Sequence, residues 1–426
     1  MPWLALPNLP SGAQASPPPT YSDTNWTNVG TSPGPELWVN AVAILGNDIY
    51  VGGAFTQVGG IAANRIAKWD GTKWSALSSG VNSLVLSLAV LGTDLYVGGY
   101  FTMAGGITVN YVAKWDGTNW SALGSGMNDR LHTVAVSGNE LVAAGWFTNA
   151  GGVAANRVAK WNGANWSALG SGLNDQVNVL AISGSDIYAG GYFTTADGMP
   201  ANRVAKWNGS NWSALGSGVG SSLNDGIFGL AVSGGDLYAG GIFTIAGGNA
   251  ARAIAKWDGT NWSGLGSGLN QSAYVLAVAG NTLYAGGFFT TAGGNPANYI
   301  AKWNGSNWWA LGAGLNMNVF GLTASGNDLY VGGNFTMAGG KAAEHLAKAR
   351  VGSKARSLVA NEFGTTVEFS GVTGYEYDLL RATNLTAPIV WAPVNTNRLI
   401  PAADGSFTFT DTNPPPGKAF YRAAEH

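Results

Sequence analysis

The stretch Ala113–Gly126, AKWDGTNWSALGSG, decides the fold, because nearly the same sequence occurs six times in the chain. The lysine of this motif recurs every 46 residues, apart from one step of 50 between Lys206 and Lys256. The extra residues lie in the stretch 216–226, GSGVGSSLNDG, which we expect to be a loop insertion. Self-similarity at a fixed period predicts a repeat architecture. The other five copies of the motif begin at Ala67, Ala159, Ala205, Ala255 and Ala301.

A second motif occurs seven times, once more than the first. It reads YVGGAFT at Tyr50 and YVGGNFT at Tyr330, and its other copies begin at Tyr96, Val142, Tyr188, Tyr238 and Tyr284. The seventh copy runs on past Lys348 without a tryptophan turn, whereas the N-terminal stretch 24–30, TNWTNVG, matches TNWSALG. We therefore expect the strand around Trp26 to supply the missing last strand of the seventh unit.

Each unit is predicted to contain four strands. In the unit of Lys206 they are residues 179–182, 187–193, 203–207 and 212–215. The second strand is rich in β-branched and aromatic residues, and an Asn-Gly pair suits the tight turn between the third and fourth. A longer loop, residues 194–202, joins the second and third strands. Four strands in each of seven units predict an all-β fold, a seven-bladed β-propeller closed by an N-terminal strand.

Three segments are expected. Residues 1–20 are predicted to be a flexible leader or linker without an evident signal peptide, because the stretch lacks a basic start and a long apolar core. Residues 21–351 form the propeller. Residues 352–426 contain short strand patterns around Gly, Asn and Pro turns, which predict a small β-sandwich module.

Composition excludes several classes of function. A net charge of -2 without a basic cluster argues against nucleic-acid binding. The absence of cysteine excludes disulfides, thiolate metal sites and cysteine nucleophiles. The three histidines, His132, His345 and His426, are too far apart to form a metal-binding motif, and no apolar run is long enough to span a membrane.

The paired glycines followed by the tryptophan–turn–tryptophan hairpin resemble kelch-type propeller repeats. The pattern GGxFTxAGG…AKWDGxxWSALGSG is similar to repeats of bacterial surface and secreted proteins, including Rax2-like cell-surface propellers, over about residues 24–350. This resemblance implies an extracellular or cell-surface location and no particular reaction. Asp411 and the FYR of residues 420–422 resemble C-terminal β-modules of secreted bacterial proteins, which implies attachment, sorting or a spacer.

The repeated lysines admit two interpretations. They could form a ring that binds an anion, or each could pair with the acid that begins the second strand of its own unit. We favour the structural interpretation, in which Trp26 is structural as well. In the sixth unit Thr282 replaces the acid. The lysines are Lys68, Lys114, Lys160, Lys206, Lys256, Lys302 and Lys348, and the acids of the units other than the sixth are Asp48, Asp94, Glu140, Asp186, Asp236 and Asp328.

Ligand-binding residues are expected where the near-identical units differ. One such position begins the first strand, and the other enters the third strand. Aromatic, Asn and Arg side chains there suit sugars or peptides through stacking and hydrogen bonds, and drift at solvent-facing positions is the alternative. The candidates are Asn40, His132, Asn178, Phe228, Tyr274 and Phe320 at the first position, with Arg65, Tyr111, Arg157, Arg203 and Tyr299 at the second.

The favoured function is a non-enzymatic secreted or cell-surface scaffold for adhesion, which binds polysaccharide or a surface protein through contacts summed over several units. A polysaccharide lyase or hydrolase and a structural subunit of an extracellular assembly are the alternatives. No catalytic residue, metal site or cofactor is assigned. Asn-Asp pairs at Asp129, Asp175 and Asp225 would at most bind Ca²⁺ weakly, and we favour the interpretation that these acids cap turns.

Overall fold

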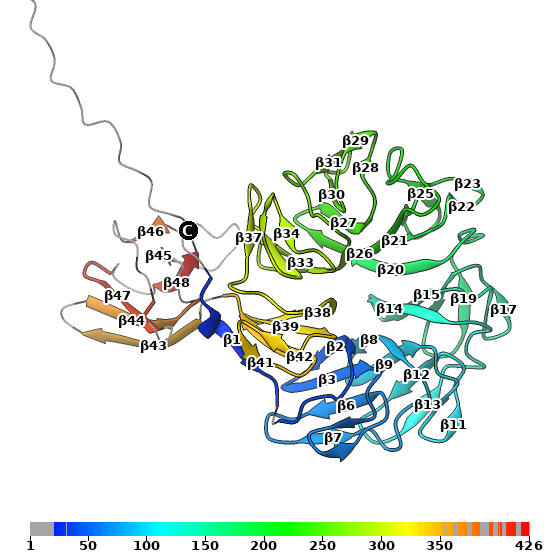
Figure 1. Cartoon of the computed structure of the whole chain (residues 1–426), viewed down its shortest axis with the longest axis horizontal. Helices are drawn as coiled ribbons and strands as arrows, with labels where there is room; N and C mark the ends of the chain where they lie inside the picture. The colour runs from blue at the N-terminus through cyan, green and yellow to red at the C-terminus, as the bar shows by residue number, and fades with distance from the viewer. Residues whose placement is uncertain are drawn as a thin grey trace, which may run out of the picture.

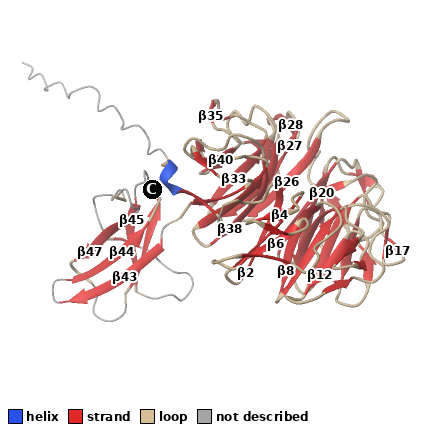
Figure 2. Cartoon of the chain, turned by 60° about the horizontal axis from the view of Figure 1, so that its bottom comes forward, coloured by secondary structure: helices blue, strands red, loops and turns tan. Residues whose placement is uncertain are grey.

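The computed structural model describes residues 21–30, 32–352, 354–361, 364–372, 377–383, 392–394, 399, 401–402, 406–414 and 419–425. The leader predicted for residues 1–20 lies outside these residues. Within the described residues the chain is all β apart from one 3₁₀ helix, η1 (Asp23–Asn25) (Figure 2). None of that part forms a helix with the length and apolar character needed to cross a membrane.

Seven four-stranded antiparallel sheets make up the described chain from residue 26 to residue 350. We call them units 1–7. Six units take their strands in chain order, and unit 7 takes its outermost strand from the N-terminus. The strands are, for unit 1, β2 (Val39–Leu45), β3 (Asp48–Gly53), β6 (Ile66–Trp69) and β7 (Trp74–Ala76); for unit 2, β8 (Val85–Leu91), β9 (Asp94–Gly99), β12 (Val112–Trp115) and β13 (Trp120–Ala122); for unit 3, β14 (Leu131–Ser137), β15 (Glu140–Gly145), β18 (Val158–Trp161) and β19 (Trp166–Ala168); for unit 4, β20 (Val177–Ser183), β21 (Asp186–Gly191), β24 (Val204–Trp207) and β25 (Trp212–Ala214); for unit 5, β26 (Gly226–Ser233), β27 (Asp236–Ile242), β30 (Ile254–Trp257) and β31 (Trp262–Gly264); for unit 6, β32 (Ala273–Ala279), β33 (Thr282–Gly287), β36 (Ile300–Trp303) and β37 (Trp308–Ala310); and for unit 7, β38 (Val319–Ser325), β39 (Asp328–Gly333), β42 (Leu346–Arg350) and β1 (Trp26–Asn28).

The loop between the second and third strands is more ordered than the sequence indicates, because in every unit it contains a two-stranded hairpin. A buried alanine in the hairpin of units 2–7 pairs with the loop that leaves the preceding unit, as Ala104 does with Val81. The hairpins therefore join neighbouring units. They are β4 (Gln57–Val58) with β5 (Ile61–Ala62), β10 (Met103–Ala104) with β11 (Ile107–Thr108), β16 (Asn149–Ala150) with β17 (Val153–Ala154), β22 (Thr195–Ala196) with β23 (Met199–Pro200), β28 (Ile245–Ala246) with β29 (Asn249–Ala250), β34 (Thr291–Ala292) with β35 (Asn295–Pro296), and β40 (Met337–Ala338) with β41 (Lys341–Ala342).

The first strands of the seven units contact one another in succession, from β2 through β8, β14, β20, β26, β32 and β38 back to β2. The sheets therefore follow one another around a common axis in a propeller-like arrangement (Figure 1). The N-terminal strand lies where the sequence predicts it. Trp26 pairs with Ala349 and Asn28 with Ala347, on the outer edge of unit 7.

The paired glycines of the second strand both lie in close contacts, the first with the next unit and the second with the start of the first strand in its own unit. A Cβ atom on Gly98 would lie 2.3 Å from a methyl group of Leu131 in the next unit, and one on Gly99 would lie 2.1 Å from the carbonyl oxygen of Leu84. Only a residue without a side chain leaves room for both contacts. The first glycine therefore allows close approach of the next unit, and the second allows close approach within its own unit.

The tryptophans join the units farther from the axis. Trp115 and Trp120 pack with ring centroids 5.3 Å apart, and Trp120 Nε1 donates a hydrogen bond of 2.9 Å to the carbonyl of Leu77 in the preceding unit. Trp26 makes the same bond, 3.1 Å, to Leu311. Trp74, where unit 1 follows unit 7, has a buried Nε1 without a partner in the described structure. The remaining tryptophans that begin a fourth strand each donate the Nε1 hydrogen bond to a leucine carbonyl of the preceding unit; they are Trp166, Trp212, Trp262 and Trp308.

The lysines and acids of the second and third strands pair as their register predicts. In every unit except unit 6 the ammonium group lies 2.7–3.2 Å from the acid. The hydrogen bond that Lys114 donates to the carboxylate of Asp94 raises the pKa of Lys114. These pairs are about one-third exposed, so each contributes at most about 1 kcal/mol. In unit 6, Lys302 is buried, and it is paired with Tyr284 across strands β33 and β36.

The C-terminal segment forms two three-stranded antiparallel sheets. Phe369 and Phe407 of the first sheet stack with centroids 5.4 Å apart, and Tyr377 of the second stacks on Phe407 at 4.9 Å. The buried carboxylate of Asp411 accepts hydrogen bonds from Arg381 (2.6 Å) and Tyr421 (2.8 Å). The sheets are β43 (Lys354–Asn361), β44 (Gly364–Ser370) and β47 (Ser406–Asp411), and β46 (Ala392–Pro393), β45 (Tyr377–Ala382) and β48 (Phe420–Glu425).

Candidate functional site

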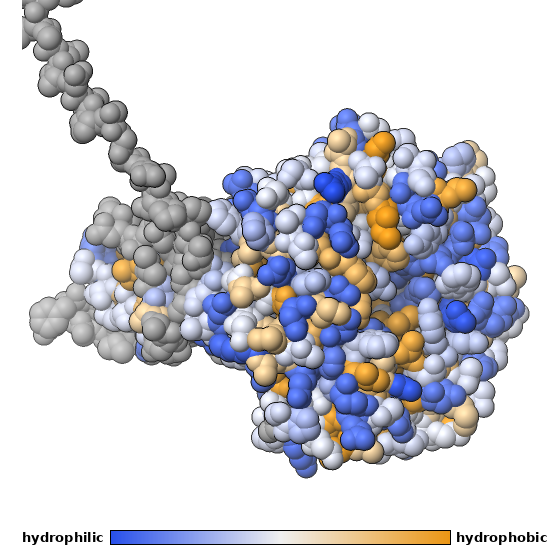
Figure 3. Space-filling view, viewed as in Figure 1, coloured by the Kyte–Doolittle hydropathy of each residue, from blue (hydrophilic) through white to orange (hydrophobic). Residues whose placement is uncertain are grey.

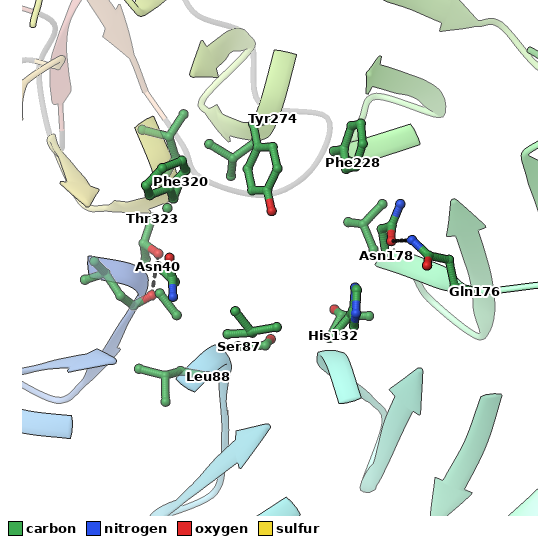
Figure 4. A pocket seen from close by; sticks show the side chains of 18 of the residues that line it. Asn40, Ser87, Leu88, His132, Gln176, Asn178, Phe228, Tyr274, Phe320 and Thr323 are labelled. Carbon is green, nitrogen blue, oxygen red and sulfur yellow. Dashed lines mark hydrogen bonds between the residues drawn. The ribbon is translucent and has the colours of Figure 1, made fainter. Parts of the chain in front are cut away.

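A pocket of about 350 Å³ lies where the first strands of the units meet (Figure 4). Each unit contributes the residue that begins its first strand. The pocket therefore brings together all six candidates from that position. The seven residues are Asn40, Leu86, His132, Asn178, Phe228, Tyr274 and Phe320.

A β-bulge in each first strand places these residues. In unit 3, Leu131 pairs with Gly145 and Thr133 with Ala144, so His132 between them has no partner across the ladder. A bulge re-aims the side chain of its extra residue. The same register shift occurs at the equivalent residue of the other six units, and it explains why one sequence position converges on one pocket.

One side of the pocket is aromatic. Phe228 and Tyr274 stack with centroids 5.3 Å apart and planes inclined by 15°, and Phe320 meets Tyr274 edge-on at 5.7 Å. Tyr192 and Phe288 extend the cluster. Tyr274 is 36% exposed, and its hydroxyl points into the pocket (Figure 4). Burial, reinforced by the nearby hydroxyls of Tyr100 and Tyr192, raises the pKa of Tyr274, so this hydroxyl is neutral at physiological pH.

Amides flank the aromatic side at its two ends, Asn40 beside Phe320 and Asn178 beside Phe228 (Figure 4). Asn40 donates a 2.9 Å hydrogen bond to the carbonyl of Val85, and Asn178 donates one of 2.9 Å to the carbonyl of Ile227. Each bond reaches the first strand of the next unit. Gln176 donates to the side-chain oxygen of Asn178 at 2.8 Å (Figure 4). The amides are thus fixed in place before any ligand binds, which lowers the entropy that binding would cost.

His132 lies across the pocket from Tyr274 (Figure 4) and is uncharged at neutral pH. Burial lowers its pKa to about 4, and the nearby Arg130 adds to this effect, whereas Asn178 and Asp129 oppose it. Its Nε2 lies 3.2 Å from the hydroxyl of Tyr100. With His132 neutral, the residues that line the pocket carry no charge, and they include neither Asp nor Glu.

The candidates that enter the third strand do not line this pocket. All seven residues at the position have left-handed backbone, with φ between 62° and 72°. In unit 1, the N–H of Arg65 donates to the carbonyl of Phe55, and the carbonyl of Arg65 accepts from the N–H of Gly53. The residues are Arg65, Tyr111, Arg157, Arg203, Ala253, Tyr299 and His345.

The three arginines of that set bond to nearby backbone. The guanidinium of Arg65 donates to the carbonyl of Ala54, and that of Arg157 donates to the carbonyl of Trp146. Arg203 is only 6% exposed, and it donates to carbonyls of Tyr192 (2.8 Å) and of the inserted loop. Through these hydrogen bonds the three arginines stabilise the neighbouring loops.

The acids named for weak Ca²⁺ binding cap loops in the structure. Asp129 and Asp175 each accept the next residue's N–H at 2.7 Å, and Asp225 accepts those of Ser221 and Ser222. Across the described ranges, no three His, Cys, Asp or Glu side chains are grouped to hold a metal ion. The binding of Ca²⁺ stays a prediction of the sequence.

No protein-family model and no curated protein matches the chain. Among solved structures, the computationally designed Ika8 protein matches with 16% identity, 76% of this chain, 99% of that chain and a TM-score of 0.47. YjhT matches with 16% identity, 65% and 97% coverage and a TM-score of 0.40. The resemblance to kelch-type and Rax2-like repeats therefore stays a prediction.

Proposed function

We propose that the chain is a seven-bladed β-propeller closed by its N-terminal strand, with a small C-terminal β-sandwich. We propose further that it is a non-enzymatic, secreted or cell-surface binding protein that recognises an uncharged glycan at the central pocket. One observation carries the proposal about the ligand. Seven units each direct a bulged side chain into one uncharged pocket that is aromatic on one side, with an amide at each end of the aromatic side.

The chemistry of this pocket suits a sugar. The apolar face of a sugar ring packs on aromatic rings, and its hydroxyls exchange hydrogen bonds with amides, an imidazole and a phenol. A volume of about 350 Å³ lies within the range of small-molecule sites. A phosphate or carboxylate ligand would lose its hydration without gaining a cationic partner from the lining residues, so the proposal commits to an uncharged ligand.

The alternatives receive less support. Glycoside hydrolysis commonly requires two carboxylates beside the scissile bond, and the lining of this pocket contains none. A subunit of an extracellular assembly would be expected to carry a large exposed hydrophobic patch. On the face shown in Figure 3, hydrophobic residues of the described chain are instead scattered among hydrophilic ones.

A glycan array tests the proposal. We expect the wild-type chain to bind uncharged glycans, with and without Ca²⁺, and the Tyr274→Ala variant to lose that binding. Met103→Ala is the matched control, because Met103 is 41% exposed, similar to Tyr274 at 36%, and lies outside the pocket. Unfolding midpoints of both variants verify that the fold is intact. A wild-type chain that binds only proteins or charged glycans, or undiminished binding by Tyr274→Ala, would overturn the proposal.

A further inference from the structure

The loop insertion between units 4 and 5 is an ordered part of the structure. Arg203 donates hydrogen bonds to the carbonyls of Ser222 (2.9 Å) and Asp225 (2.8 Å). The carboxylate of Asp225 accepts the N–H groups of Ser221 (2.7 Å) and Ser222 (2.8 Å). These bonds present Leu223 at the surface, where its side chain is 86% exposed. The corresponding loops that follow units 2 and 3 lack the extra residues. Packing of one unit on the next therefore does not need the inserted residues or an exposed leucine.

The insertion borders a second pocket of about 590 Å³. Leu223 lines one part of it, and Trp146 of unit 3, which is 40% exposed, lines another. Gln176 and Tyr192 line both this pocket and the central one, so the two pockets adjoin. The ring of Trp146 also lies 6.5 Å from that of His132 in the central pocket.

The second pocket, like the first, favours an uncharged ligand. Its two charged residues are Arg203 and Asp175, which have opposite signs. Arg203 is only 6% exposed and is bonded to backbone carbonyls, and the carboxylate of Asp175 accepts the N–H of Gln176. The exposed apolar groups of Trp146 and Leu223 remain for contact with a ligand.

We propose that the insertion builds a second subsite, so that the ligand is a linear uncharged oligosaccharide of several rings. Its terminal ring occupies the central pocket, and the following rings pass Gln176 and Tyr192 to reach Trp146 and Leu223. This inference rests on the proposed function, because it assumes that the central pocket binds a sugar. It adds that the ligand is a chain and that one loop sets the chain length which is recognised.

Calorimetric titration with uncharged gluco-, manno-, galacto- and xylo-oligosaccharides of one to six rings tests the inference. We expect the affinity of the wild-type chain to rise by about tenfold between the shortest ligand that binds and chains that reach Trp146, as one added aromatic contact provides. Deletion of residues 220–223 restores the loop length of units 2 and 3. We expect this deletion to remove the gain from chain length and to leave the affinity for the shortest ligand unchanged.

A second variant protects the test against misfolding of the deletion. Leu223→Ser changes only a highly exposed side chain, and we expect it to reduce the gain from chain length by several-fold. An affinity that is independent of chain length in the wild type, or a gain that survives both changes, would overturn the second subsite and leave the central site standing. Failure of the wild type to bind any of these sugars would overturn the proposed function, and the inference with it.

Discussion

Replacement of Trp26 with alanine is expected to destabilise the ring of units by roughly 4–6 kcal/mol. Trp26 is 1% exposed, and loss of a buried tryptophan side chain costs about 3–5 kcal/mol. Loss of the hydrogen bond from Nε1 to the carbonyl of Leu311 adds about 1 kcal/mol. It adds no more than that, because the N–H of Gly314 also donates to this carbonyl, at 3.1 Å.

The matched variant is Trp166→Ala. Trp166 is 5% exposed and donates the same bond, 2.8 Å, to Leu123, but its strand is continuous with the rest of unit 3. Both variants should lower the urea midpoint that circular dichroism records. Only Trp26→Ala should release the N-terminal strand, so amide hydrogen exchange should accelerate at residues 24–28 in that variant alone. A loss of stability below about 1 kcal/mol, or residues 24–28 that already exchange freely in the wild type, would refute the reasoning.

Three further predictions concern single residues. The pKa of His132 is about 4 in the folded chain, against 6.5 for the free side chain, so the unfolded state takes up a proton first as the pH falls. Up to about 3 kcal/mol of stability is therefore lost between pH 6.5 and pH 4. Urea titrations at several pH values should show a shallower loss of stability for His132→Asn, and equal slopes for wild type and variant would contradict this. Asp411→Asn is expected to destabilise the C-terminal sheets by about 2–4 kcal/mol, because it leaves Arg381 without its buried anionic partner. Amide hydrogen exchange should accelerate in β44 and β45. Unchanged protection there would argue against a stabilising role of the Asp411–Arg381 pair. Gly99→Ala should lower the free energy of unfolding by about 3 kcal/mol or more, because the new Cβ meets a backbone carbonyl. Gly98→Ala should lower it by about 1–2 kcal/mol, because the new Cβ meets a side-chain methyl. Thermal unfolding that shows the reverse order would exclude this account of the paired glycines.

The repeat made much of the fold predictable from sequence. Because the units are nearly identical, the strand order, the acid–lysine register and the displaced strand of Trp26 could all be inferred by comparing one unit with another. The small hairpins were missed, since strands of two residues leave no periodic pattern. Their order comes from contacts with the preceding unit, such as the pairing of Val81 with Ala104, which depend on the assembled structure.

The candidate site was predictable in part for the same reason. Variation among the units identified two positions, and sequence alone could not separate them. The structure separates them through backbone geometry, because a bulge directs His132 and its equivalents into the central pocket, whereas Arg203 and its equivalents occupy left-handed turns beside the loops. Neither feature leaves a signature in residue type. The second pocket was also missed, although the insertion at residues 216–226 was visible.

The most direct test of the central site is a crystal structure of the chain grown with the uncharged oligosaccharide that binds best. We expect a terminal sugar ring against Tyr274 on the axis of seven four-stranded sheets, with its hydroxyls within hydrogen-bonding distance of the flanking amides of Asn40 and Asn178. A sugar bound only at the outer strands, or a different number of sheets around the axis, would contradict the proposed site and the proposed fold respectively.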